Sequence, residues 1–193
     1  MKKVLLTAIA VLGFLISNAQ ERSKGDIELA PIIGYSSYFL NGDEVDGLKS
    51  ISSVNFGVEA DYFFNDRWSL RSGLHYQKMG GKDSFGKLEM NYVIVPINAN
   101  WHFGSTRKWN LNFGASTGFL TSAELYNEDV KSEVNSFQMG ISYGIGYKLE
   151  ISDKFSILFD AQGFTGLSNY LKDSDYTRMN AGSNINIGGV FKL

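Results

Sequence analysis

The chain has 193 residues, of which 44% are apolar, 20% charged and 14% aromatic, with 21 glycines, 2 prolines and no cysteine. This composition is too rich in apolar and aromatic residues for a disordered chain, and the lack of cysteine excludes disulfides and any cysteine-ligated metal or redox site. The net charge of −2, without a cluster of lysines and arginines, gives no sign of nucleic-acid binding.

The first nineteen residues have the pattern of a secretory signal peptide. Lys2 and Lys3 precede an apolar run, and Ala19 ends a cleavage motif of small residues. We expect cleavage after Ala19, which divides the chain into a signal peptide, residues 1–19, and a single barrel domain, residues 20–193. The apolar run has only about 13 residues, too few to cross roughly 30 Å of hydrocarbon as a helix, so we do not expect a membrane anchor.

Beyond the leader, apolar and polar residues alternate with a period of two. Within residues 109–121, for example, Trp109, Leu111 and Phe113 alternate with asparagine, glycine and serine. A strand presents its two faces in this way. The same pattern predicts eight strands, at residues 26–39, 52–64, 68–79, 87–103, 109–122, 136–151, 155–166 and 179–192.

The connections between these strands alternate strictly between long and short. The short connections are residues 65–67, 104–108 and 152–154, and the long polar ones are residues 40–51, 80–86, 123–135 and 167–178. Short periplasmic turns and long outer loops are typical of barrels in the bacterial outer membrane. We therefore predict an all-β fold, an eight-stranded antiparallel up-and-down transmembrane β-barrel in the outer membrane of a Gram-negative bacterium, with both termini at the periplasmic end.

The chemistry of the two faces favours a membrane barrel over a soluble β-sandwich, which is the alternative. Small neutral residues dominate the polar face, and they suit a narrow interior better than a solvated surface, where lysine and glutamate are common. The aromatic residues gather near the short turns, as Trp68 and Trp101 do, and near the long loops, as Tyr35 and Tyr170 do. Two aromatic girdles around an aliphatic band indicate contact with lipid headgroups.

Four features together resemble the PorT-like outer-membrane β-barrel family over residues 20–193. They are the leader ending in Asn18-Ala19-Gln20, the glycine–aromatic alternation, the segment Tyr-Val-Ile-Val-Pro-Ile-Asn at residues 92–98, and a final strand that ends on Leu193. The resemblance implies a fold and a location. The family is mostly of unassigned function, and one branch is linked to protein secretion and gliding. We expect outer-membrane lipid and lipopolysaccharide as partners, with the barrel-insertion machinery during biogenesis.

Several charged and polar residues of the predicted inner face form a candidate lumen network. They are Glu59, Asp61, Arg71, His75, His102, Lys148 and Asp160. The short turn at residues 65–67 places Asp61 opposite Arg71, and Glu59 then lies within diagonal reach of Arg71 and His75. Because eight strands leave an interior just wide enough for side chains, we predict that these residues form a charge-paired plug. A proton or ion path is the alternative.

We predict no enzymatic activity, no cofactor and no metal site. The chain has 2 histidines, His75 and His102, and neither has a serine at a spacing typical of a catalytic triad, since Ser72 points to the other face of its strand. The spacing of these histidines and Asp61 matches no known metal motif. A lipid-modifying outer-membrane enzyme is the less favoured interpretation of the same residues.

The outer loops are acidic, a pattern that more often marks a simply solvated surface and less often an interaction site. Residues 40–51 contain Asp43, Glu44 and Asp46, and residues 123–135 contain four further carboxylates. Such loops can bind a partner protein or divalent cations that bridge lipopolysaccharide. The sequence thus leaves two functions open: a structural or interaction protein with a plugged lumen, and a transporter of a small or hydrophobic solute.

Overall fold

The computed structural model describes residues 22–193, so the expected signal peptide and its cleavage site lie outside the described residues. The strands are β1 (Ile27–Gly42), β2 (Lys49–Phe63), β3 (Trp68–Lys82), β4 (Lys87–Phe103), β5 (Trp109–Leu125), β6 (Glu128–Asp129), β7 (Phe137–Ser152), β8 (Phe155–Gly166) and β9 (Arg178–Lys192). One 3-10 turn, η1 (Lys131–Glu133), lies between β6 and β7. In this part of the chain no helix is long and apolar enough to cross a membrane.

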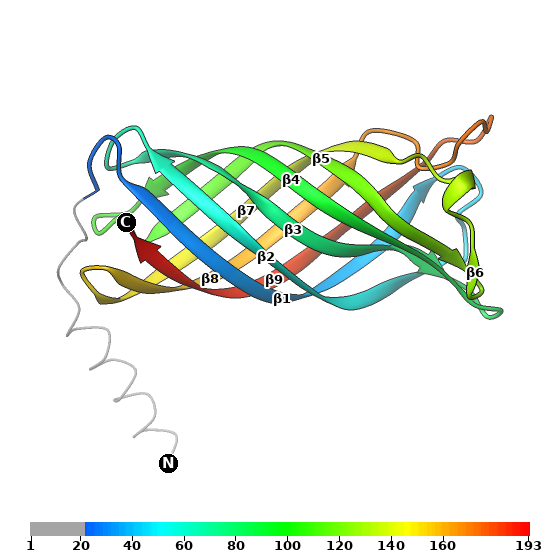
Figure 1. Cartoon of the computed structure of the whole chain (residues 1–193), viewed down its shortest axis with the longest axis horizontal. Coiled ribbons are helices and arrows are strands. Elements are labelled where there is room, and N and C mark those ends of the chain that lie inside the picture. The colour runs from blue at the N-terminus through cyan, green and yellow to red at the C-terminus, as the bar shows by residue number, and fades with distance from the viewer. Residues whose placement is uncertain (1–21) are drawn as a thin grey trace, which may run out of the picture.

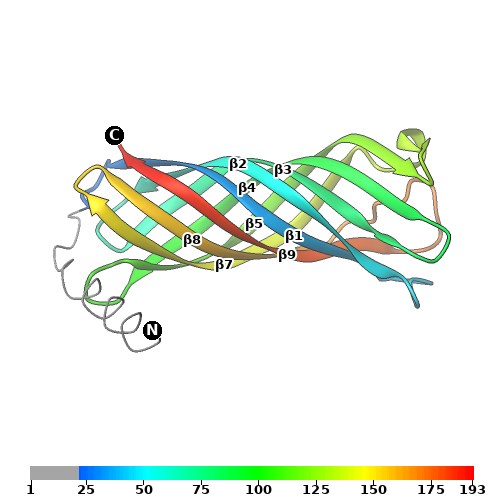
Figure 2. The same ribbon diagram turned by 90° about the horizontal axis from the view of Figure 1, so that it is seen from below.

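The long strands close into a single barrel (Figures 1 and 2). Each strand pairs antiparallel with its neighbour, β4 pairs with β5, and β1 pairs with β9, while the two-residue β6 only extends the end of β5. The start of β1, the C-terminus and the short turns lie at one end, and the long connections lie at the other (Figure 1). The predicted all-β up-and-down barrel of eight strands is confirmed.

Several strands run further toward the long loops than the sequence predicts. β3 extends to Lys82 and β5 to Leu125, whereas the pattern places their ends at residues 79 and 122. In β3 the alternation breaks at Gly80, whose φ of 140° lies in a region that L side chains rarely adopt. A glycine pair at this point has the composition of a loop, yet Gly80 and Gly81 continue to pair with β4.

The barrel is apolar outside and polar inside over much of its length. The side chain of Phe113 is 58% exposed, while its neighbour Asn112 is 2% exposed and faces the lumen. The same alternation recurs on the other long strands, which expose Val54, Leu74, Ile97, Phe137, Phe159 and Ile187 among others. This is the inverse of a soluble protein, and it fits a molecule whose surrounding solvent is lipid.

Aromatic side chains form a continuous band at the end with the short turns. Trp68, Trp101, Phe103 and Trp109 follow one another across neighbouring strands, with ring centroids 5.1 to 6.3 Å apart. At the other end one prediction is wrong. Tyr170 is not a girdle residue but is 2% exposed, because the connection between β8 and β9 folds over the mouth of the barrel and turns the Tyr170 ring inward.

Candidate functional site

The lumen is filled by two chemically different clusters of side chains. Toward the short turns the inner face is mostly polar and charged, and toward the long loops it is apolar. β4 shows the change within one strand, because His102, Asn100 and Asn98 are followed on the same face by Ile94 and Tyr92. We call these the polar network and the apolar cluster.

Arg71 is the centre of the polar network. The strand register places it opposite Asp61, and its Nη2 lies 2.9 Å from Asp61 Oδ2. Its Nη1 lies 3.3 Å from Glu59 Oε2 and 3.5 Å from Asp160 Oδ1, so one guanidinium faces three carboxylates from β2 and β8. Arg71 is 1% exposed. A charge this deeply buried is tolerated only when it is paired and hydrogen-bonded.

A second group of charges lies nearer the end of the barrel with the short turns. The ammonium of Lys148 pairs with Glu28 and lies 3.6 Å from Asp61 Oδ2. Glu28 also accepts a hydrogen bond of 2.7 Å from Arg22 Nε. The cationic groups of Arg22 and Lys148 lie 5.4 and 5.5 Å from the centre of the Phe63 ring. Arg22 precedes the first strand, where no alternation of residues exists that could predict its inward direction.

His102 contacts a serine that the sequence analysis missed. Ser69 Oγ donates to Asp61 Oδ1 over 2.8 Å and lies 2.9 Å from His102 Nε2. The sequence spacing of the serines gives no sign of this contact, which arises because the cross-strand pair Ser69–Asn100 brings Ser69 diagonally next to His102. A catalytic triad needs the carboxylate on the histidine Nδ1. Here Asp61 contacts the serine instead, and His102 Nδ1 has no hydrogen-bond partner among the described residues.

His75 lies beside a small cavity between the polar network and the apolar cluster. Its Nε2 is 3.6 Å from Glu59 Oε1, and the cavity has a volume of about 40 Å³. That is room for a few water molecules. Four polar atoms of the residues that line it make no hydrogen bond within residues 22–193. They are His75 Nε2, Asn112 Nδ2, and the ion-paired atoms Glu59 Oε2 and Arg71 Nη1, which lie 3.3 Å apart. Across residues 22–193, no three histidine or carboxylate side chains are arranged to hold a metal ion.

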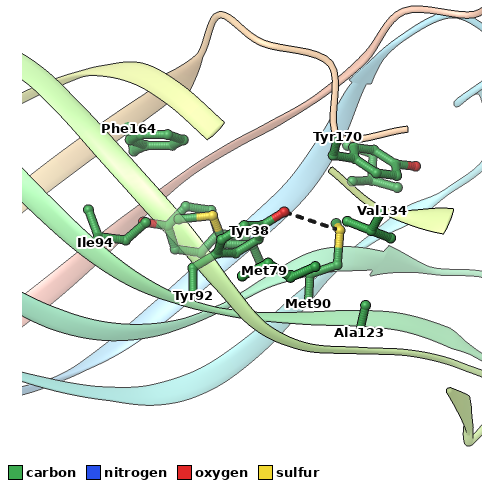
Figure 3. Close-up of a cluster of buried hydrophobic side chains, with 11 residues drawn as sticks. Tyr38, Met79, Met90, Tyr92, Ile94, Ala123, Val134, Phe164 and Tyr170 are labelled. Carbon is green, nitrogen blue, oxygen red and sulfur yellow. Dashed lines mark hydrogen bonds between the residues drawn. The ribbon is translucent and has the colours of Figure 1, made fainter. Parts of the chain in front are cut away.

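Three residues of the apolar cluster, Tyr38, Ile94 and Phe164, line this cavity, and the cluster fills the lumen between it and the long loops. Figure 3 shows the side chains of the cluster. Tyr38, Met79, Met90 and Tyr92 are buried there, and the Tyr92 hydroxyl lies 3.7 Å from Met90 Sδ. Around them pack Leu40, Ile94, Leu120, Ala123, Val134, Phe164 and Tyr170. No local sequence pattern predicts this cluster, although its strand residues share a face with the polar lumen residues.

Two long connections pair with each other over the outer mouth. The backbone N–H of Asn135 donates to the carbonyl of Tyr170 over 2.8 Å, and that of Lys172 donates to Glu133 over 3.0 Å. An isolated β-bridge joins Val134 to Leu171 between these two bonds. The outer end of the barrel is therefore covered by ordered backbone, which places Val134 and Tyr170 on top of the apolar cluster.

An apolar outer surface, a filled polar lumen and a closed antiparallel sheet define an outer-membrane β-barrel. The chain belongs to the outer membrane protein beta-barrel domain family, whose model matches residues 18–172. The protein is thus located in the outer membrane of a Gram-negative bacterium. No curated protein matches the sequence significantly.

Solved structures of small outer-membrane barrels share the fold. The outer membrane protein OprG from Pseudomonas aeruginosa is 12% identical with a TM-score of 0.58, over 91% of this chain and 99% of that one. Neisserial surface protein A (NspA) is 14% identical with a TM-score of 0.53, over 86% of this chain and 97% of that one. At such identities the likeness concerns the fold, and the role of this chain must be argued from its own residues.

Proposed function

We propose that this protein is a closed outer-membrane barrel that acts as a structural or interaction protein through its outer loops. The observation that carries the proposal is that the lumen is filled at two levels, by the polar network around Arg71 and by the apolar cluster around Tyr92. A barrel filled in this way can contact molecules in the aqueous medium only at its two ends. The long loops form the larger of these ends.

The outer loops supply an acidic surface for such contacts. Glu124 of β5 lies opposite Asp129 of β6, whereas its other neighbour, Glu89 of β4, is already paired with Lys78 and Lys87 over 2.7 Å each. Glu128 is exposed at the tip of the same hairpin. Like charges directly opposite each other destabilise a sheet, so a binding partner that supplies cations would be stabilising there. Divalent cations that bridge lipopolysaccharide and a basic protein surface both have this chemistry.

Solute transport is the alternative, and the cavity beside His75 is the feature that favours it. The cavity is small, however, and it lies between the two filled levels of the lumen. A catalytic role has less support, because Ser69 and His102 are both buried and Asp61 contacts the wrong partner for a triad. We therefore propose a non-enzymatic protein.

Planar-bilayer recording separates these functions. The purified barrel should give a conductance near zero, and a steady conductance would favour transport and overturn the closed-lumen proposal. The interaction role is tested by placing a photo-crosslinking amino acid at Glu128 in the outer hairpin or at Asp153 in a periplasmic turn. Crosslinks in native outer membranes that depend on position 128 support the role of the outer loops. Equal products from both positions contradict it.

We further propose that the chain belongs to the PorT-like group within its family, on the strength of residues 92–98. This segment lies in β4 at the change from apolar to polar lumen, with Pro96 facing the cavity beside His75. Outer-membrane lipid and lipopolysaccharide are the proposed surroundings, and the insertion machinery would bind β9. Crosslinking from Phe191 during biogenesis tests the last contact, and products identical to those from Asp153 would contradict it.

A further inference from the structure

A vestibule opens to the outside between the long loops. Its volume is about 310 Å³, within the range of small-molecule sites. The floor is the top of the apolar cluster, formed by Leu40, Val134 and Tyr170. Its walls are also largely apolar, with Leu48, Leu88, Leu125, Val130 and Leu171 among the lining residues. The vestibule therefore presents a concave apolar surface to the aqueous medium.

Three lysines form a row across neighbouring strands beside this vestibule. Lys49 of β2 lies directly opposite Lys82 of β3, and Lys82 lies directly opposite Lys87 of β4. Both Lys82 and Lys87 line the vestibule. Lys87 pairs with Glu89 over 2.7 Å, but Lys82 has no acidic partner within residues 22–193. Directly opposed like charges are destabilising, and an anion at this row would remove that cost.

The other charged groups of the vestibule are mostly satisfied by the protein itself. Arg178 lies 3.6 Å from Glu44 and donates to the carbonyl of Asp43 over 2.9 Å. The Asp83 carboxylate accepts hydrogen bonds from two backbone N–H groups of its own turn and from the Tyr126 hydroxyl. Glu133 is the exception, because in the described part of the chain its carboxylate has no cationic partner. Glu133 belongs to η1, so it lies on a different element from the lysine row, which is at the ends of β2, β3 and β4.

We propose that the vestibule binds a soluble single-chain amphiphile with an anionic head group, taken up from the outside medium. The head group pairs with Lys82 and Lys87, and the apolar part lies on the floor and against Leu48. This inference rests on the proposed function, because only a closed lumen makes the mouth a binding site instead of an entrance. The site requires both features at once, a charge that Lys82 can pair with and an apolar body of limited volume.

The probe for this proposal is 8-anilinonaphthalene-1-sulfonate, an anionic aromatic amphiphile that fluoresces in apolar sites. Its neutral analogue N-phenyl-1-naphthylamine lacks the sulfonate and measures the contribution of the charge. The barrel is reconstituted in phosphatidylcholine nanodiscs, and titrations of empty discs are subtracted. We expect saturable binding of the sulfonate that weakens as salt is added. The double variant Lys82→Gln/Lys87→Gln should raise its Kd at least tenfold, with little effect on the neutral probe.

Three further variants make the result specific. Leu48→Ser removes apolar wall from a loop outside the barrel and should weaken both probes. Lys154→Gln, in a periplasmic turn, should change neither. Glu133→Gln should leave binding of the sulfonate unchanged or make it tighter, because it removes a repulsive charge.

Binding that is equal in empty discs, or unchanged in the double lysine variant, overturns the proposal. Weaker binding of the sulfonate in Glu133→Gln, with no change in the double lysine variant, would show that the lysine row does not hold the anion and would also overturn the proposal. If the sulfonate fails to bind while the barrel is non-conducting, the vestibule proposal fails and the closed-barrel function stands. A large conductance refutes the proposed function itself.

Discussion

Arg71 on β3 and Asp61 on β2 lie directly opposite each other inside the barrel, with 2.9 Å between Nη2 and Oδ2. The two residues are not equivalent. Asp61 has Lys148 as a second cation at 3.6 Å, whereas Arg71 is the cation that faces Glu59 and Asp160 as well as Asp61. Removing the guanidinium of Arg71 therefore leaves more buried charge unpaired than removing the carboxylate of Asp61 does.

Arg71→Ala should destabilise the barrel more than Asp61→Ala does. Removing one partner of a buried pair costs about 3–5 kcal/mol, and we place Arg71→Ala at or above the upper end of that range and Asp61→Ala at the lower end. The double variant should lose less than the sum of the two. Urea-dependent unfolding in lipid vesicles measures these differences. Strictly additive losses would show that the two side chains do not interact.

The control for this experiment is the exposed ion pair at the periplasmic turns. Asp66 Oδ2 lies 3.1 Å from Arg107 Nε, and the Asp66 side chain is largely exposed. Exposed pairs contribute about 0–1 kcal/mol, so Asp66→Ala should barely shift the urea midpoint.

Phe113→Arg should impair insertion and stability because it places a charge on the lipid-facing surface. Such a charge near the bilayer midplane costs roughly 2–4 kcal/mol, and Phe113→Leu is the matched apolar control. Heat-modifiable migration on gels and folding yield in vesicles measure the effect. Equal yields for the arginine and leucine variants would show that Phe113 does not contact the lipid interior.

Gly114→Ala should destabilise the pairing of β4 with β5. A Cβ at position 114 would lie 2.0 Å from the backbone carbonyl oxygen of Ile97, so the two strands would have to separate. Overpacking of this kind costs about 1–3 kcal/mol. Gly189→Ala is the control, because there the nearest atom is a Phe155 ring carbon at 3.1 Å, a side chain that can move. Similar urea midpoints for both variants would contradict the close backbone approach.

Tyr170→Ala should loosen the two paired connections that cover the outer mouth of the barrel, without opening a pore. Truncating a buried aromatic side chain costs about 3 kcal/mol or more, so the unfolding midpoint should fall. The polar network around Arg71 lies deeper in the lumen and is untouched, so bilayer conductance should stay near zero. The exposed Tyr176 in the same connection serves as the control, and Tyr176→Ala should have little effect on either measurement. A pore opened by Tyr170→Ala alone would show that only one level of the lumen is filled.

The carboxyl of Asp26, which precedes β1, should titrate below its ordinary pKa. A hydrogen bond from the Lys192 ammonium, followed by one from the Ser23 backbone N–H, lowers the pKa of Asp26. A pKa that is lower in the folded state contributes stability above the ordinary pKa near 4, and that contribution is lost as the pH falls through the lower folded value. Lys192→Gln should therefore raise the pKa of Asp26, as carboxyl NMR titration would show. An unchanged titration curve in Lys192→Gln would exclude the ion pair.

The sequence predicts the strands and their faces well because each long strand has one face in lipid and one in the lumen. At Phe113 and Asn112 this contrast is strong, and the period of two is unambiguous. The register of Asp61 with Arg71 was also predictable, because a short turn leaves few ways to pair β2 with β3. The local sequence is therefore sufficient to predict strand register where neighbouring strands are joined by tight turns.

Other features depend on contacts that no local pattern records. Tyr170 is in a long connection, where composition does not indicate whether an aromatic ring faces lipid or lumen. Met90 and Tyr92 share a face with His102, so their inward direction was predictable, but their apolar character resembles that of lipid-facing residues. Arg22 reaches the polar network from the segment that precedes β1. Ser69 reaches it through a diagonal contact between β3 and β4.

The pairing of β1 with β9 joins the two ends of the described chain, since Glu28 lies opposite Lys192. Loop-closure entropy makes contacts of such large sequence separation slow to form, and this ladder is the one that removes the last open edges of the sheet. The cylinder therefore cannot be completed until β9 has left the ribosome, because β9 is synthesised after the other strands of the barrel. Until then β1 and the growing end are unpaired edges prone to aggregation, so the chain depends on being kept unfolded until it reaches the membrane.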